Sequence, residues 1–117
     1  MQGSYLGPEY SQKEIEYELN KLGAVYEVKN EKDLLSQTAE DLSKGEAIGW
    51  FQGRMEFGPR ALGGRSILGD PRSEIIQKNL NLKVKYRESF RPFAPSILRE
   101  DLSDWFEMDS DLSLIHI

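Results

Sequence analysis

Apolar residues recur at helical spacing in the first part of the chain. Ile15, Leu19 and Leu22 stand at i, i+4 and i+7, which predicts a helix with one apolar face. Ser11 and Glu14 precede this set in the order of a capping box, in which each side chain bonds a free backbone amide of the other residue. The pattern therefore predicts a helix that begins just after Ser11.

A second helix is predicted from about Lys32 to Lys44. Its apolar face is made of five residues: Leu34, Leu35, Thr38, Ala39 and Leu42. Gly23 and Gly45 directly follow the two predicted helices, at the position where a left-handed backbone ends many helices. Both helices are expected to have a structural role only.

Short apolar runs predict strands between and after these helices. Residues 24–28 and 47–51 each form such a run, and the second is apolar enough for a buried strand. Ile67 and Leu68 begin a third short strand. From Gln52 to Arg65 the chain has no apolar periodicity and is rich in glycine, which predicts a long ordered loop that carries function.

Asp70 and Pro71 predict the start of another helix, because aspartate caps helix N-termini and proline fits the first helical turn. This helix is predicted to run through Ile75 and Ile76 to about Leu80. Three further segments are predicted as a basic loop, an extended stretch and a short helical turn: residues 83–91, 93–98 and 100–106. The alternation of helices and strands favours a layered α/β or α+β domain.

Charge is distributed in three blocks along the chain. Residues 1–53 hold five lysines, no arginine and ten acidic residues, whereas residues 54–99 hold all seven arginines, three lysines and four acidic residues. Residues 100–117 hold six acidic residues and neither lysine nor arginine. The middle block, with a net charge of +6 (ten basic minus four acidic residues), is the candidate anion-binding surface. A basic face that is solvated, or paired with the acidic blocks, explains this charge equally well.

The remaining composition excludes several classes of protein. The chain has no cysteine, which excludes a disulfide scaffold and a thiolate metal site. It has no apolar run of about 18 residues and no signal pattern at its start, so a cytoplasmic location without membrane contact is expected. Its 117 residues fit one domain with a modest core. The one histidine, His116, is not expected to bind a metal.

Three arginines recur in the predicted loop, at Arg54, Arg60 and Arg65. The planar guanidinium binds phosphate or carboxylate oxygens through paired N–H groups, and nearby glycines let backbone amides approach a ligand closely. The spacing of glycine and lysine is neither that of a P-loop nor that of a dinucleotide-binding fingerprint. Glu56 lies among these arginines and either binds Mg²⁺ together with phosphates or orients an arginine; the second role is favoured.

Two long strings carry a resemblance to a known family. The chain reads Gly-Arg-Met-Glu-Phe-Gly-Pro-Arg-Ala-Leu-Gly-x-Arg-Ser-Ile-Leu and, further on, Lys-Tyr-Arg-Glu-x-Phe-Arg-Pro-Phe-Ala-Pro. Both resemble the C-terminal domain of the NodU/CmcH-type carbamoyltransferases, over about Tyr5 to Phe106. The resemblance implies a YrdC-like layered domain, with short strands and helices around a mixed sheet. Such a domain joins ATP and carbamoyl phosphate into carbamoyl adenylate.

The resemblance also implies site residues, partners and cofactors. Lys85 and Arg87 match a Lys-x-Arg pair that grips phosphate, and they are the expected catalytic residues. Five further residues are expected to bind ATP or carbamoyl phosphate: Arg54, Arg60, Arg65, Ser66 and Arg91. Mg²⁺ is expected with ATP. Iron is expected only in a larger N-terminal domain of the actin-like ATPase class in the same polypeptide, which passes the carbamoyl group to a hydroxyl of a small molecule.

Some features depart from the family pattern. Gly64 stands where the family usually has asparagine, and the Ser-x-Asn partner of the Lys-x-Arg pair is not found. Residues 1–111 are interpreted as an incomplete domain and residues 112–117 as an atypical tail, so the isolated chain is not expected to complete carbamoyl transfer. Two other functions stay open: a nucleic-acid-binding module and a non-catalytic interaction fragment. The overall acidity, and the lack of aromatic residues interleaved with basic ones, disfavour nucleic acid.

Overall fold

The computed structural model describes residues 4–107 of the chain. The chain separates into two compact units, one formed by Gly3–Asp70 and the other by Pro71–Ile117 together with Met1–Gln2. Each unit is described by itself below. The predicted tail at residues 112–117 and His116 lie outside the described residues.

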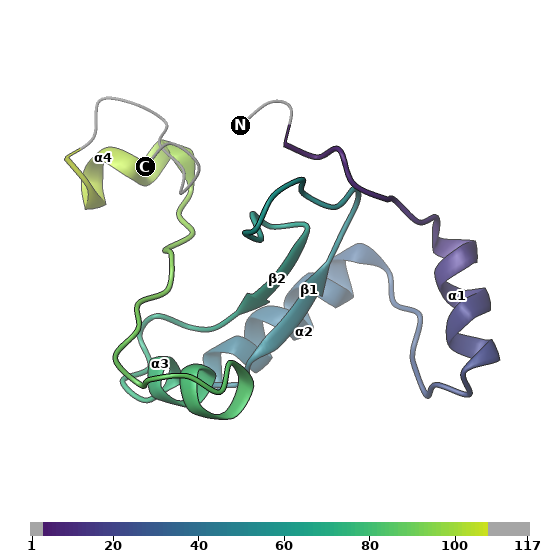
Figure 1. Cartoon of the computed structure of the whole chain (residues 1–117), viewed down its shortest axis with the longest axis horizontal. Coiled ribbons are helices and arrows are strands. Elements are labelled where there is room, and N and C mark those ends of the chain that lie inside the picture. The colour runs from purple at the N-terminus through teal and green to yellow at the C-terminus, as the bar shows by residue number, and fades with distance from the viewer. Residues whose placement is uncertain (1–3, 108–117) are drawn as a thin grey trace. The chain divides into compact units, whose positions relative to one another are not determined.

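Two helices open the first unit, and both end where the sequence predicts (Figure 1). Helix α1 (Gln12–Lys21) begins after Ser11, whose backbone amide donates to Glu14 Oε2 at 2.8 Å and whose hydroxyl accepts from the Glu14 amide at 3.4 Å. Helix α2 (Glu31–Ser43) begins one residue before the predicted start. Gly23 and Gly45 have φ of 67° and 85°, so the left-handed termination expected of both is confirmed.

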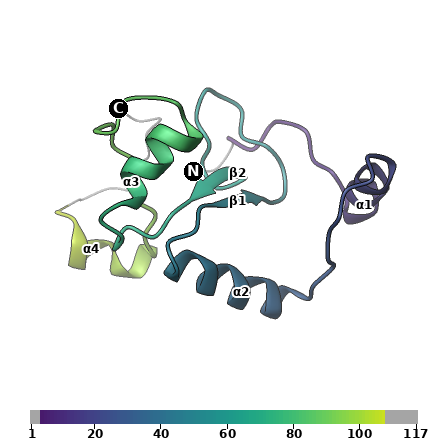
Figure 2. The ribbon, with the colours of Figure 1, turned by 90° about the horizontal axis from the view of Figure 1, so that it is seen from below.

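Strands β1 (Ile48–Phe51) and β2 (Arg65–Leu68) form an antiparallel pair. The strand predicted at residues 47–51 is confirmed, whereas the strand predicted to begin at Ile67 begins at Arg65 and ends at Leu68. Figure 2 shows the two strands side by side, with α2 preceding β1 along the chain and contacting it. Their register pairs Ile48 with Leu68 and Phe51 with Arg65. The prediction that β1 is buried was wrong: its residues alternate between half-buried and exposed, because a sheet of two strands covers little of its own surface.

The strand predicted at residues 24–28 is absent, since this stretch has neither helix nor strand. An apolar run becomes a strand only by pairing, and no described segment pairs with it. The described residues therefore contain one antiparallel sheet of two strands in place of the expected mixed sheet. The mixed α/β character of the chain is confirmed, whereas its YrdC-like arrangement stays a prediction.

The second unit consists of short helical pieces. These are α3 (Ile76–Asn79), the π-helix η1 (Leu80–Val84), the 3₁₀-helix η2 (Arg99–Asp101) and α4 (Leu102–Trp105). The last two confirm the helical turn predicted near the end of the described residues. The helix start predicted at Asp70 and Pro71 was wrong, because turns occupy the chain until Ile75 and α3 has no side-chain cap. Aspartate followed by proline suits a turn as well as a helix start.

Few hydrophobic side chains are buried in either unit. Among residues 4–107 only Ile76 and Leu80 are buried hydrophobic residues, so the modest core expected from the length is smaller than predicted. The buried polar residues are Glu56 and Asn81, which are 4% and 0% exposed. None of the described helices combines the length and the apolar content that crossing a membrane requires.

Candidate functional site

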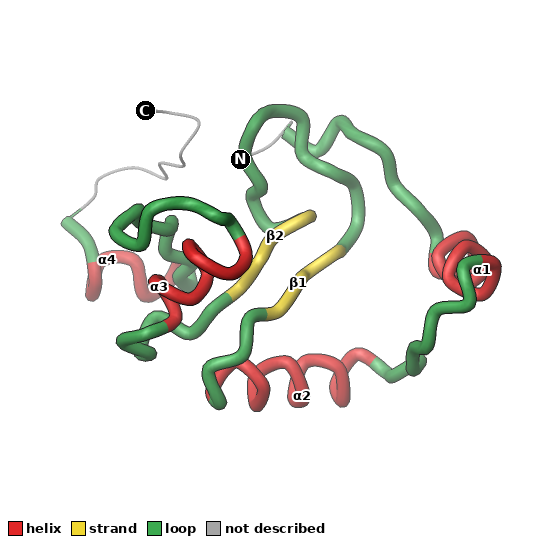
Figure 3. Tube along the Cα trace, turned by 60° about the horizontal axis from the view of Figure 1, so that its bottom comes forward, coloured by secondary structure: helices red, strands yellow, loops and turns green. Residues whose placement is uncertain are grey.

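The loop between β1 and β2 is the first of two segments that carry predicted site residues. Residues 52–64 form neither helix nor strand, as predicted (Figure 3). Hydrogen bonds close the loop at its base: the Gln52 amide donates to the Gly64 carbonyl at 3.0 Å, and Gln52 Nε2 donates to the Gly63 carbonyl at 3.2 Å. The Ser66 hydroxyl accepts from the Gly63 amide at 3.0 Å, which leaves its own O–H as a donor.

Glu56 organises this loop from inside. Its Oε1 accepts hydrogen bonds from the amides of Leu62 and Gly64, each at 2.6 Å. The favoured interpretation, in which Glu56 orients an arginine, was therefore wrong. No sequence pattern indicates the bonds that form, because they join a side chain to backbone amides six and eight residues away.

The bonds to Glu56 also set its ionisation. Burial alone raises the pKa of this carboxyl, but backbone amides, including those of Leu62, Gly64 and Arg65, outweigh burial and hold the pKa below its usual value. Glu56 is therefore a carboxylate at neutral pH. A carboxylate accepts hydrogen bonds from amides more strongly than a neutral acid does, so its charge stabilises the loop.

Gly64 is buried directly against Glu56. A Cβ at this position would lie 3.0 Å from the Arg54 carbonyl oxygen and 3.1 Å from Glu56 Oε2. Those distances are shorter than ordinary van der Waals contact, so a side chain at this position requires its neighbours to shift by a few tenths of an ångström. The lack of a side chain at Gly64 thus leaves room for the buried carboxylate of Glu56.

Arg65 lies across the base of the loop. Its Nη1 donates to the carbonyls of Gln52 and Gly64 at 2.9 and 2.7 Å, and its Nη2 donates to the Gly53 carbonyl at 3.1 Å. Its guanidinium carbon lies 3.4 Å from the centroid of the Phe51 ring. Three of its five N–H groups are therefore engaged by the loop itself, and two stay available for a ligand.

Arg54 ties the loop to the segment that precedes α1. Its Nη1 donates to the Gly7 carbonyl at 3.0 Å, and its Nη2 lies 3.3 Å from Glu9 Oε2. Backbone bonds join the same two segments, because the Gly7 amide donates to Met55 and the Met55 amide donates to Pro8, both at 2.9 Å. About half of each side chain of the Arg54–Glu9 pair is exposed, so an anion can compete with Glu9 for this arginine.

Arg60 differs from the other two arginines of the loop. Its side chain is exposed and makes no hydrogen bond or ion pair with any residue of the described range 4–107. It follows Gly58, whose φ of 137° is closed to most other residues. All five N–H groups of Arg60 are therefore available to a ligand.

The segment from Lys85 to Arg91 carries the other predicted site residues and lies in the second unit. It follows η1, where the Lys85 amide donates to the Leu80 carbonyl at 2.8 Å. Tyr86 has φ of 50°, which is uncommon outside glycine and turns the chain sharply between Lys85 and Arg87. A strained backbone of this kind occurs often at binding sites.

Asn81 orders this segment, and the sequence analysis missed it. Its Nδ2 donates to the carbonyls of Ser89 and Arg91 at 3.1 and 2.8 Å, while its Oδ1 accepts from Arg87 Nε at 2.6 Å. Arg87 also lies over the Phe93 ring, with 4.9 Å between its guanidinium carbon and the ring centroid. Asn81 lies in a stretch of alternating polar and apolar residues, which gives no sequence signal for such a role.

Lys85 and Arg91 are both exposed. Arg91 Nε lies 2.8 Å from Glu88 Oε2. The pKa of Glu88 is held below its usual value, first by a hydrogen bond from the backbone of Glu88 itself and next by the charge of Arg91. The Lys85 side chain makes no hydrogen bond or ion pair with another described residue. Arg54, Arg65 and Ser66 thus cluster at the loop base of the first unit, whereas Lys85, Arg87 and Arg91 share one segment of the second. Phosphate binding by any of them stays a prediction.

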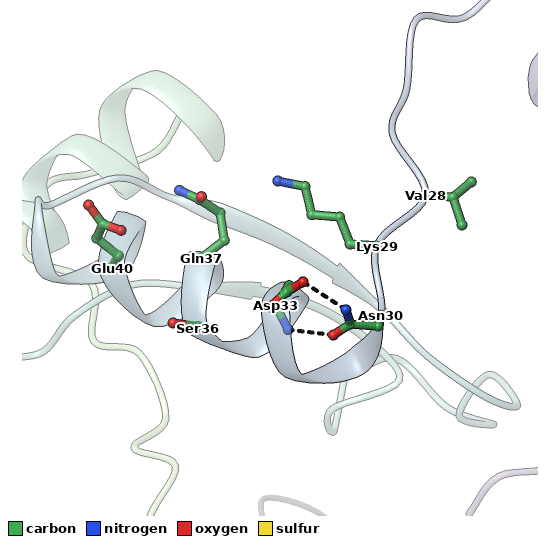
Figure 4. A pocket seen from close by; sticks show the side chains of 7 residues that line it. All are labelled: Val28, Lys29, Asn30, Asp33, Ser36, Gln37 and Glu40. Atoms are coloured by element: carbon green, nitrogen blue, oxygen red, sulfur yellow. Dashed lines mark hydrogen bonds between the residues drawn. The ribbon is translucent and has the colours of Figure 1, made fainter.

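A separate shallow hollow lies beside the first turns of α2 (Figure 4). Its volume is about 460 Å³, and apart from Val28 its lining is polar: Lys29, Asn30, Asp33, Ser36, Gln37 and Glu40. Asn30 and Asp33 bond each other as the cap of α2. The hollow holds none of the predicted site residues, and no described residues group three or more metal-binding side chains.

Comparison with known proteins decides the family. Residues 39–116, two thirds of the chain, match the family described as carbamoyltransferase C-terminus. The chain belongs to this family. The resemblance carried by the two strings is thereby confirmed, and the matched range includes all seven predicted site residues of this carbamoyltransferase C-terminal domain.

Relatives of this carbamoyltransferase C-terminal domain are much longer proteins. An uncharacterized protein of Synechocystis sp. is 58% identical over 111 residues, which cover 93% of this chain and 18% of that protein. Nodulation protein NolNO of Sinorhizobium fredii is 48% identical over 109 residues, covering 92% and 16%. The 3'-hydroxymethylcephem-O-carbamoyltransferase of Streptomyces clavuligerus is 47% identical over 68 residues, covering 58% and 13%. The chain thus spans less than a fifth of each relative.

Proposed function

We propose that this domain binds ATP and carbamoyl phosphate and forms or holds carbamoyl adenylate. In forming it, the carbamoyl oxygen bonds to the α-phosphorus of ATP as pyrophosphate leaves, and water takes the phosphoryl group of carbamoyl phosphate as free phosphate. The carbamoyl group then passes to a hydroxyl of a small-molecule acceptor, which loses its proton, and AMP is released. The observation that carries the proposal is the family match over residues 39–116, with a relative named as an O-carbamoyltransferase. In this proposal the chain has a YrdC-like fold and works with an N-terminal actin-like ATPase-class domain that holds iron.

The chemistry of the proposed reaction fits the side chains described above. ATP and carbamoyl phosphate are both anions, so fixed cations are needed to lower their repulsion and to stabilise charge that develops on phosphate oxygens. Arg60 and Lys85 have side chains without partners among the described residues, and Arg87 is held with its terminal nitrogens open. Mg²⁺ would accompany the ATP phosphates. In this proposal Arg54 and Arg65 shape the loop as well as contribute charge.

Two observations limit the alternative of a nucleic-acid-binding module. All seven arginines are confined to residues 54–99, and the chain as a whole carries a net charge of −5. Three of the loop's arginine donors bond its own backbone instead of pointing outward. Binding to RNA that ATP does not displace would favour this alternative, and absence of any anion binding would favour a non-catalytic interaction fragment.

The half-reaction can be tested with the longest polypeptide that contains this chain. The protein is incubated with ATP, carbamoyl phosphate and Mg²⁺ without any acceptor, and carbamoyl adenylate is measured by mass. The proposal expects carbamoyl adenylate with the unaltered protein and a large loss with Lys85→Ala. Ser103→Ala, an exposed change in α4 outside both basic segments, serves as the control. Absence of carbamoyl adenylate from an active transferase would contradict the proposal.

A further inference from the structure

Asn81 is fully buried and uses every hydrogen-bonding group of its side chain. Both hydrogens of Nδ2 are engaged by the carbonyls of Ser89 and Arg91, and Oδ1 accepts from Arg87 Nε. The Asn81 carbonyl also accepts from the Arg87 amide at 2.9 Å. A buried amide with all its groups bonded fixes its neighbours in one geometry, because any rotation leaves a polar group unpaired. Arg87 is therefore held at both its backbone and its side chain.

The contacts of Arg87 leave one part of its guanidinium open. Nε is bonded to Asn81, and one face lies over the Phe93 ring at a distance typical of a cation–π contact. Nη1 and Nη2 make no hydrogen bond with any residue between 4 and 107. Four N–H groups in one plane thus remain for a ligand, and the two terminal nitrogens together match two oxygens of a phosphate.

A neighbouring residue separates two possible roles of Asn81. Gln77 Nε2 donates to the carbonyls of Phe90 and Arg91 at 3.4 and 3.1 Å, so it orders the same loop. Within the described residues, Gln77 makes no hydrogen bond to the Arg87 side chain. If loop order alone matters for binding, Gln77 and Asn81 should affect binding alike; if Arg87 matters, only Asn81 should.

We propose that Asn81 is a positioning residue for phosphate binding: it fixes Arg87 so that Nη1 and Nη2 take two oxygens of one phosphate group. This inference rests on the proposed function, since that function supplies the phosphate. It adds a residue that contacts no ligand and acts through Arg87. Its consequence is that charge at position 87 is not enough, because a lysine has no Nε–H that Asn81 can hold in this geometry.

The first test needs no variant. In the ¹⁵N-labelled chain, the exchange of arginine Nε–H protons with water is measured for Arg87 and for Arg60, which has no partner among the described residues. The Arg87 proton should exchange slower by on the order of tenfold, because its hydrogen bond must open first. Asn81→Leu should remove this protection and Gln77→Ala should leave it. Equal exchange for Arg87 and Arg60 in the unaltered chain overturns the positioning role.

The second test links the position of Arg87 to binding. ATP affinity is measured by calorimetry for the unaltered chain, Asn81→Leu, Arg87→Lys, the double variant and Gln77→Ala. Asn81→Leu should weaken ATP binding about tenfold, which corresponds to losing one charge-assisted bond. It should weaken binding no further when residue 87 is lysine, since the interaction it supports is then already gone. Gln77→Ala should bind as the unaltered chain does.

The outcomes separate the two claims. Additive losses in the double variant, or an equal loss with Gln77→Ala, mean that Asn81 only orders the loop, and they overturn the inference. Absence of ATP binding by the unaltered chain overturns the proposed function instead, while the exchange measurement still decides whether Arg87 is held. If Asn81→Leu fails to fold, Asn81→Ser, which is smaller and polar, replaces it in both tests.

Discussion

Arg60 and Arg65 are both arginines of one loop, yet their surroundings give them different tasks. Arg65 donates three hydrogen bonds to carbonyls at the base of the loop and lies against Phe51, so its removal affects the loop itself. Arg60 is exposed, and its side chain makes no hydrogen bond or ion pair within the described part of the chain. Its charge is therefore available to a ligand without any cost to the fold.

Changing Arg60 to alanine should lower ATP affinity without altering the loop. The loss should be about tenfold at low salt, the value of one charge-assisted hydrogen bond, and it should shrink as salt is added. Calorimetry gives the affinity, and the amide spectrum of residues 52–66 reports the loop. Arg65→Ala is the matched comparison and should disturb that spectrum. Unchanged ATP affinity with Arg60→Ala would remove this residue from the proposed site.

Glu56 should titrate below the usual range of a glutamate. Its pKa is lowered in the folded loop, so its bonds to the Leu62 and Gly64 amides persist above the ordinary value of 4.5 and are lost as pH falls through the lower folded value. The amide proton shifts of Leu62 and Gly64, followed by NMR against pH, should show one midpoint below 4.5. Glu56→Gln should abolish that transition. A midpoint at or above 4.5 would refute the assigned bonding.

At the scale of elements, Gly64 offers a sharp test of the loop. A methyl group there would lie 3.0 Å from the Arg54 carbonyl oxygen and 3.1 Å from Glu56 Oε2, closer than ordinary van der Waals contact. A methyl group at Gly49 in β1 meets nothing within 4 Å. Gly64→Ala should therefore destabilise the first unit by about 1–3 kcal/mol, as overpacking of a buried position does. Gly49→Ala should change its stability little. Urea unfolding followed by circular dichroism measures both, and equal stabilities would contradict the described packing.

The elements that could be predicted from the sequence are those fixed by local interactions. Helix α1 is set by Ser11 and Glu14 at one end and by Gly23 at the other, all within one short stretch. The strand predicted at residues 24–28 failed because a strand needs a partner distant in the sequence, and apolar residues alone do not supply one. Asp70 and Pro71 failed for a related reason: the same dipeptide suits two local structures.

The candidate site likewise contains residues that could be predicted from the sequence and residues that could not. Its cations could be found, because arginine, glycine and lysine at these positions make a recognisable pattern, and the family match confirms the resemblance. The side chains that hold them could not. Glu56 and Asn81 act through bonds to backbone groups several residues away, and those bonds exist only once the loop has folded. The sequence pattern singles out Glu56 but not Asn81, and it reveals the contacts of neither.

At the scale of the whole molecule, the chain is proposed to supply one part of a larger reaction scheme. It spans less than a fifth of the length of the relatives named above, such as NolNO, of which it covers 16%. Its proposed chemistry relies on cations, which stabilise an anionic donor but do not remove a proton from an acceptor hydroxyl. Complete carbamoyl transfer is therefore proposed only for the longer protein that contains this chain.

The isolated chain should accordingly fail to carbamoylate any hydroxyl. The purified chain is incubated with ATP, carbamoyl phosphate, Mg²⁺ and a panel of sugar hydroxyls, and carbamoylated product is sought by mass. Carbamoyl adenylate without carbamoylated sugar would agree with this division of labour. Repeated turnover to a carbamoylated sugar would contradict it, because the transfer step would then reside in this domain.

The central claim is that the basic segments of this chain bind the phosphates of ATP. It is tested most directly by titrating the unaltered chain with ATP and with adenosine at low and at high salt. ATP should bind at least about tenfold more tightly than adenosine at low salt, because several charge-assisted bonds form only with its phosphates, and added salt should reduce the difference. Equal affinities for ATP and adenosine at low salt would contradict the claim.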